Sequence, residues 1–140
     1  MAFTGNYTCN SFKSGLLSGN FDFDTPGDTI KMALYTNAAT LDEDTAAYTT
    51  DGEVSASGYT AGGVTLTVEK GIANNTAFIS FENATISNAA FTARGALIYK
   101  SGSGNPAICV LDFGSDKTST TSFIVTFPTA SSADALIRLS

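Results

Sequence analysis

The C-terminal half of this chain alternates short, strongly apolar segments with turns rich in glycine, asparagine, serine and threonine. Strands that follow one another through such turns are typical of antiparallel β-sheet. Since the alternation continues almost to the last residue, it predicts an antiparallel, all-β body. The four segments expected to be strands are residues 94–100, 106–113, 122–127 and 135–139.

The preceding part of the chain contributes further strands. Residues 30–35 place Ile30, Met32 and Leu34 on one face, which we expect to point into the core. The other candidate strands are residues 64–68, 77–81 and 84–87. A total of about seven or eight strands, with turn signals roughly every ten residues, favours an antiparallel β-sandwich over a closed barrel.

The chain has 140 residues, which is the size of one domain and enough to bury a sizeable core. We therefore expect residues 1–140 to form a single β-sandwich-like domain. One short helix is predicted near the N-terminus, capped by Asn6 or Thr8 and ended by Gly19. Its apolar face consists of Cys9, Phe12 and Leu16.

A polar segment, residues 36–63, separates the first strong strand from the next. A connection of that length within a compact domain is usually functional, or is partly structured by its own packing. It contains Tyr48 and Tyr59, which we single out as candidate interface residues for a neighbouring protein. A tyrosine folded back onto its own domain is an equally good interpretation of either position.

The charge balance restricts the partners of the chain. The formal net charge is −6, with only seven lysines and arginines, so no basic patch is available to neutralise phosphates. We expect neither nucleic acid nor an anionic membrane to be a partner. The N-terminal residues lack the charged and apolar regions of a signal peptide, which predicts synthesis in the cytosol. Cys9 and Cys109 are then expected to be buried thiols rather than a disulfide.

The residues offer little catalytic or metal-binding chemistry. Acidic residues gather at Asp42, Glu43 and Asp44, with Asp51 and Glu53 nearby, but their spacing matches no EF-hand loop. A solvated acidic loop is the favoured interpretation, and we predict no metal site and no cofactor. Histidine is absent from the chain, which excludes every catalytic arrangement that needs an imidazole base.

Two acidic motifs were considered for catalysis and set aside. Asp112-Phe113-Gly114 resembles a kinase tripeptide, but the other kinase motifs are missing, so we expect a strand that ends in a turn over residues 114–117. Pairs such as Asp22 and Asp24, or Asp112 and Asp116, have the residue type that glycoside hydrolysis needs. The acids are few and lie in expected loops, so we predict that the chain is not an enzyme.

Several segments together resemble a family of small tailed-bacteriophage proteins. The resemblance spans nearly the whole chain, and members of the family are usually described as hypothetical or virion structural proteins. It implies a component of the virion made in the host cytoplasm, without an active site whose residues could be transferred. The segments that carry it are residues 5–13, 30–41, 53–54, 58–63, 91–99 and 110–117.

Within that family resemblance, the sequence is interpreted as a capsid decoration or cement protein that stabilises the phage head through contacts between subunits. A tail or neck component is the alternative within the structural class. A carbohydrate-binding adhesion module is the alternative outside it, with Tyr48 and Tyr59 as the candidate aromatic contacts. Because several strands carry few charges at their edges, we also expect a homo-oligomer, as a trimer or a larger ring.

Overall fold

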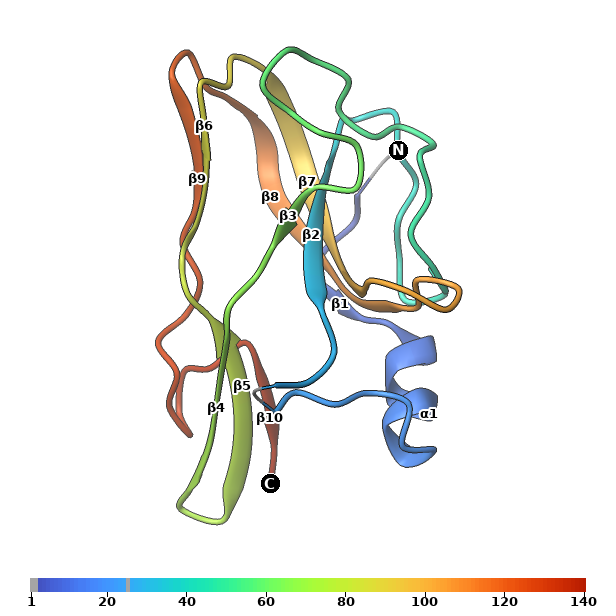
Figure 1. The fold of residues 1–140 in the computed structure, drawn as a ribbon, viewed down its shortest axis with the longest axis vertical. Helices are drawn as coiled ribbons and strands as arrows, with labels where there is room; N and C mark the ends of the chain where they lie inside the picture. Colours follow the sequence, from blue (N-terminus) through green and yellow to red (C-terminus); the bar gives the residue numbers. More distant parts are fainter. Residues whose placement is uncertain (1–2, 25) are drawn as a thin grey trace.

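A computed structural model describes residues 3–24 and 26–140. The chain is mostly β, with antiparallel sheets and one short N-terminal helix, which confirms the predicted fold class (Figure 1). The prediction that the N-terminus is not a signal peptide concerns Met1 and Ala2 among other residues, and these two lie outside the described residues. The elements are β1 (Tyr7–Thr8), α1 (Asn10–Leu17), β2 (Ile30–Tyr35), β3 (Val64–Thr65), β4 (Val68–Ala73), β5 (Thr76–Phe81), β6 (Ala84–Ser87), β7 (Thr92–Lys100), β8 (Ala107–Thr118), β9 (Ser122–Val125) and β10 (Ile137–Leu139).

The largest sheet has five strands in the order β1-β8-β7-β2-β3 and is buried on both faces. Ile30, Met32 and Leu34 of β2 point into the larger core, as their alternation predicts. Ala33 and Tyr35, on the opposite face of the same strand, are just as completely buried in a second core. A sheet buried on both faces needs a covering layer on each side.

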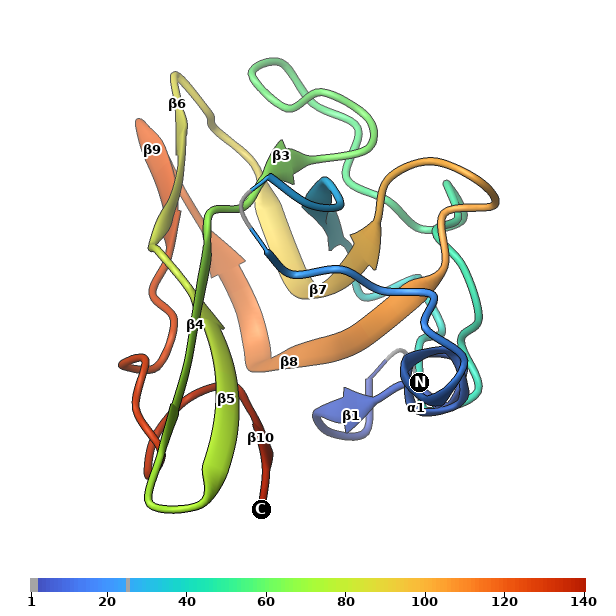
Figure 2. The same cartoon turned by 60° about the horizontal axis from the view of Figure 1, so that its bottom comes forward.

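The first covering layer consists of two smaller sheets, β10-β5-β4 and β6-β9. Their apolar side chains share one core with the five-stranded sheet, and β6 and β9 run side by side along its edge in both views (Figures 1 and 2). The β4–β5 hairpin projects from one end of the molecule beside β10 (Figure 2). The covering side chains in this core include Phe81, Ala84, Ile86, Phe123, Val125, Phe127 and Ile137.

The second covering layer is the first part of the long connection, residues 36–48, which packs on the other face of the five-stranded sheet, whereas Val54 and Tyr59 from its later part belong to the larger core. Ala39 and Leu41 are buried in the second core together with Leu97 and Val110 of the sheet. Backbone hydrogen bonds attach the connection as well, from Val54 N–H to the Leu34 carbonyl among others. The connection is therefore structured by its own packing, which was one of the two interpretations of its length.

The described residues form ten strands rather than seven or eight. One additional strand is β1. The other arises because the single strand predicted over residues 64–68 is wrong: the structure has two strands there, β3 and β4. The chain passes from one sheet to another at Leu66 and Thr67: the Leu66 N–H donates to Ile30, whereas the Thr67 carbonyl accepts from Glu82. An apolar alternation that continues through such a crossing gives no local sign of the change of partner.

The turn predicted after Phe113 is also wrong, because β8 continues to Thr118. The register of its pairing with β7 shifts between the pairs Gly95–Asp112 and Ala93–Lys117, so residues 113–116 form a bulge. Gly114 supplies the left-handed backbone conformation in this bulge, with φ of 84°. A glycine followed by polar residues indicates a bulge as readily as a turn.

Helix α1 forms over Asn10–Leu17, but neither predicted cap acts as one. The N-cap is Cys9, whose own N–H donates to the Ile108 carbonyl, so the backbone of β8 fixes the start of the helix. Asn6 instead accepts a hydrogen bond from the Asp112 N–H through Oδ1, at 2.6 Å. Phe12 is buried, and Gly15 leaves space for the Phe21 ring, which would lie 2.6 Å from a Cβ at that position.

Gly63 gives a test of the close approach between the long connection and β2. A Cβ at Gly63 would lie 1.8 Å from the Met32 carbonyl oxygen, whereas one at Gly104 would meet no atom within 4 Å. Both glycines have φ of 82°, so an alanine at either position introduces the same kind of backbone strain. We expect Gly63→Ala to lower the unfolding free energy by about 2 kcal/mol or more beyond Gly104→Ala, because the contacting atom belongs to rigid backbone. Equal losses in urea unfolding would contradict this packing.

Candidate functional site

The most connected polar side chain in the long connection, residues 36–63, is Glu53. Its Oε1 accepts a hydrogen bond from the Tyr48 hydroxyl at 2.7 Å, and its Oε2 accepts from the Tyr59 hydroxyl at 2.6 Å and the Gly62 N–H at 2.8 Å. The Tyr59 hydroxyl in turn accepts from the Leu34 N–H of β2 at 2.9 Å. One carboxylate thus joins three parts of residues 36–63 to each other and, through Tyr59, to the sheet.

The two candidate interface tyrosines are brought together by this carboxylate. Tyr59 is 9% exposed, and its ring meets the Phe91 ring edge to face at 5.7 Å. Tyr48 is half-buried and stacks on Tyr99 with ring centroids 4.9 Å apart. Both side chains therefore make internal contacts of the kind considered as the alternative, and their role at an interface stays a prediction.

Burial raises the pKa of the tyrosine hydroxyls in and around this cluster. Removal from water is the largest cause for Tyr35, Tyr48, Tyr59 and Tyr99, and the nearby charge of Glu53 adds to it for all four. These hydroxyls therefore stay protonated and donate hydrogen bonds over the ordinary pH range. These hydroxyls therefore act as fixed donors that hold residues 36–63 together.

The other acidic candidates make local or structural contacts. Asp44 accepts a hydrogen bond from the Asn10 amide at 2.9 Å, and Asp42 accepts one from the Asp44 N–H at 2.9 Å. Asp112 is paired with Arg94 on the neighbouring strand. Among residues 3–24 and 26–140, no group of three or more acidic or cysteine side chains is placed to hold a metal ion.

Cys9 and Cys109 are both free thiols, and both are buried. Burial raises the pKa of Cys9 to about 12 and raises that of Cys109 further. Cys9 belongs to the second core and Cys109 to the first, so they lie on opposite faces of the sheet. Neither is activated as a nucleophile.

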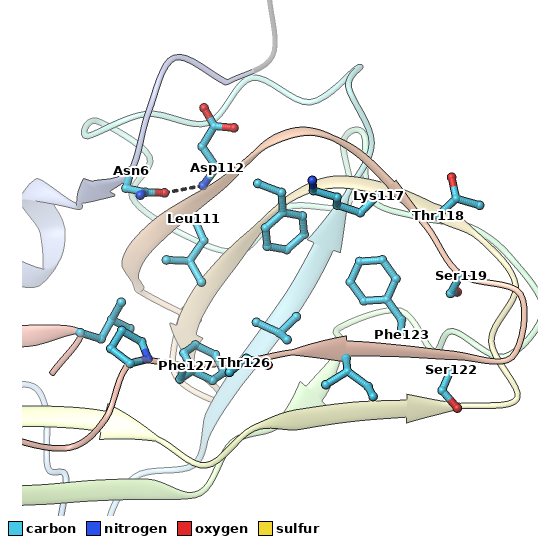
Figure 3. Close-up of a pocket in the computed structure, with 15 residues that line it drawn as sticks. Asn6, Leu111, Asp112, Lys117, Thr118, Ser119, Ser122, Phe123, Thr126 and Phe127 are labelled. Carbon is cyan, nitrogen blue, oxygen red and sulfur yellow. Dashed lines mark hydrogen bonds between the residues drawn. The ribbon is translucent and has the colours of Figure 1, made fainter. Parts of the chain in front are cut away.

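A hollow of about 550 Å³ opens between β8 and β9 (Figure 3). Leu111, Phe123 and Phe127 point into it, while the carboxylate of Asp112 points away (Figure 3). Its lining comes from β8 and Ser119 after it, from β9 and the residues after it, and from Asn6 and Leu136, with none from β6 or β7. The hollow therefore lies along the edge of β9 that faces away from β6, and along the part of β8 that follows its short pairing with β1.

This hollow continues toward the helix. Leu136 lines it, lines a smaller hollow of about 100 Å³ beside β1, and lines a third of about 840 Å³ between α1 and β10. We call the three together the edge furrow. Leu17 of α1 and Leu139 of β10 line its helix end and are 91% and 55% exposed, and Ile124 of β9 is 60% exposed. Exposed apolar side chains along unpaired strand edges are features of a contact surface.

Neither the edge furrow nor the role of Glu53 is evident from the sequence. Strand periodicity indicated β9, but no local pattern shows that its neighbour in sequence, β8, pairs elsewhere and leaves an edge free. Glu53 was grouped with the acidic residues near Asp42, although the aromatic residues on either side of it in sequence, Tyr48 and Tyr59, are its partners. An acidic residue flanked at five and six positions by tyrosines was the available signal.

Comparison of the chain with protein-family models, with curated proteins and with solved structures finds no match. Within the described part of the chain, no helix is both long enough and apolar enough to cross a membrane.

The raised tyrosine pKa values predict the alkaline stability of the fold. An unfolded tyrosine loses its proton near pH 10, whereas the buried ones keep theirs to higher pH. The stabilisation is complete below pH 10 and is lost as the pH rises above it, by up to about 1.4 kcal/mol per pH unit for each such tyrosine. We expect the unfolding free energy of Tyr59→Phe to fall less steeply than that of the wild type in urea titrations between pH 8 and 11.5. Parallel curves would contradict the burial of this hydroxyl.

Proposed function

We propose that this protein is a non-enzymatic structural component of a phage virion, acting as a decoration or cement protein on the head. The observation that carries the proposal is the contrast between the inside and the edge of the molecule. Inside, Glu53 and the Arg94–Asp112 pair are fully used by internal contacts. At the edge, strand backbone and apolar side chains are left without partners among the described residues.

This arrangement supports binding to other proteins of the particle rather than catalysis. A mostly β domain with few charges and no histidine suits a role that needs no titrating centre. A sugar-binding module would present aromatic rings to solvent, but Tyr48 and Tyr59 are engaged with Glu53, Tyr99 and Phe91. The contrast therefore favours a structural role over the adhesion module, and the resemblance to virion structural proteins agrees with it.

The physical mechanism of such a role is mass action. A protein that binds the assembled shell, and not its separated subunits, stabilises the shell by an amount that grows with its concentration relative to its dissociation constant. Many weak contacts, repeated by the symmetry of the particle, then add up. We propose that this protein is itself a homo-oligomer on that surface, as expected for a domain with free strand edges.

The proposal is tested on particles of the phage that encodes the chain. We expect mass spectrometry of purified virions to find the protein in many copies, as a fixed fraction of the major capsid protein. Particles that lack it should release their DNA at a lower temperature, and adding the purified protein should restore the release temperature. Absence of the chain from purified virions would overturn the proposal, and presence only in tail fractions would move it to the tail.

A further inference from the structure

The backbone of β9 has hydrogen-bonding groups that face the edge furrow. The Thr121 carbonyl accepts from Ala89, and the Phe127 N–H donates to Asn83, so both residues direct these groups toward the β6 side. Backbone groups of an extended strand alternate between its two sides. The side chains of Phe123, Val125 and Phe127 are buried in alternation with exposed neighbours, which shows that the extended conformation continues to residue 127.

It follows that Ile124 and Thr126 direct their N–H and C=O groups away from β6 and toward the hollow. No strand among the described residues pairs with this side of β9. The lining of the hollow includes every residue from Ser122 to Pro128 and none of β6, which agrees with that direction. Pro128 has no N–H, so the available edge ends there.

The hollow has the size and the floor that an added strand requires. Five residues of β-strand extend about 16 Å, close to the length of the edge from Ser122 to Thr126. A strand there would make β6-β9 a three-stranded sheet, and a two-stranded ribbon is marginal by itself. On its inner face the strand would meet Leu111 and Phe127, and on its outer face it would cover Ile124.

The charges around the hollow indicate which strand would fit. Asp112 is neutralised by Arg94, and its carboxylate points out of the hollow (Figure 3). Lys117 is exposed and makes no ion pair with any other described residue, so it is the lining charge that lacks a counter-charge. A carboxylate on the incoming strand would complement it.

We propose that the free edge of β9 binds an extended segment of another protein, with apolar side chains alternating with acidic ones, as an added β-strand. Main-chain hydrogen bonds to Ile124 and Thr126 supply the binding, and Lys117 selects for acidic side chains. The inference rests on the proposed function only in taking the partner to be a protein of the particle. Failure to find the chain in virions would overturn the function, whereas failure of strand binding would overturn this inference.

The test uses the full chain and two end-blocked octapeptides as probes, one alternating valine with glutamate and one alternating valine with lysine. We expect the glutamate peptide to bind more tightly, and to slow the exchange of the Ile124 and Thr126 amide hydrogens measured by NMR. The Phe123 and Val125 amides, which already face β6, should change little. Lys117→Glu should reverse the preference between the peptides, whereas Lys70→Glu, on the separate strand β4, should not.

A matched pair of variants isolates the backbone contact. Thr126→Pro removes the N–H that faces the hollow and should weaken binding about tenfold, the value of one hydrogen bond. Thr126→Ala keeps that N–H and should bind as the wild type does; thermal unfolding of both checks that the fold is kept.

No peptide binding, or equal binding by the two variants, would overturn the proposal, and equal binding of the two peptides would overturn the acidic partner. Self-association of the chain that Thr126→Pro abolishes would identify a second copy as the occupant and overturn a separate partner.

Discussion

The hydrogen bonds of the Glu53 carboxylate are the contacts on which the long connection, residues 36–63, depends. Residues 36–63 contain no strand of the main sheets, so their path is fixed by buried side chains and by hydrogen bonds to the sheet, such as those that the Tyr35 and Tyr99 hydroxyls donate to the Thr49 and Gly62 carbonyls. Three donors converge on this one carboxylate, from Tyr48, Tyr59 and Gly62. Hydrogen bonds to a charged group contribute about 1.5–3 kcal/mol each, and a buried donor left unpaired costs a similar amount.

The position of the long connection determines which parts of the molecule remain available for contacts. With residues 36–48 on one face, and Val54 and Tyr59 together with β4, β5, β6 and β9 on the other, the central strands β7 and β2 are enclosed. The edges on the β8 side are different, because β1 pairs with only two residues of β8 and β9 pairs only with β6. The closed side holds the fold together, and the open side carries the contacts that we propose.

The sequence predicted those elements that depend on local periodicity. The apolar alternation of β2 identified both the strand and its core-facing residues, Ile30, Met32 and Leu34. The opposite face of β2 was missed, because Ala33 and Tyr35 are covered by a polar connection that shows no periodicity. The break between β3 and β4 was missed because a strand that changes partner keeps its alternation.

The features of the candidate sites were less predictable, since they arise from contacts between distant segments. Tyr59 had two equal interpretations, and its burial depends on Phe91 and Leu34, more than twenty residues away on either side. The free edge of β9 depends on β8 pairing with β7 through a bulge at Gly114 rather than with β9. Local patterns indicate that a segment is a strand but not which of its edges is left free.

Native-state hydrogen exchange in Glu53→Ala is the most direct measurement of the central claim. Glu43→Ala is the control, because that side chain is exposed in the same connection. If Glu53 holds residues 36–63 in place, the Val54, Tyr59 and Gly63 amides should lose protection while those in the middle of β7 keep theirs. Protection that stays as in the control, or that falls equally throughout the sheet, would contradict the account.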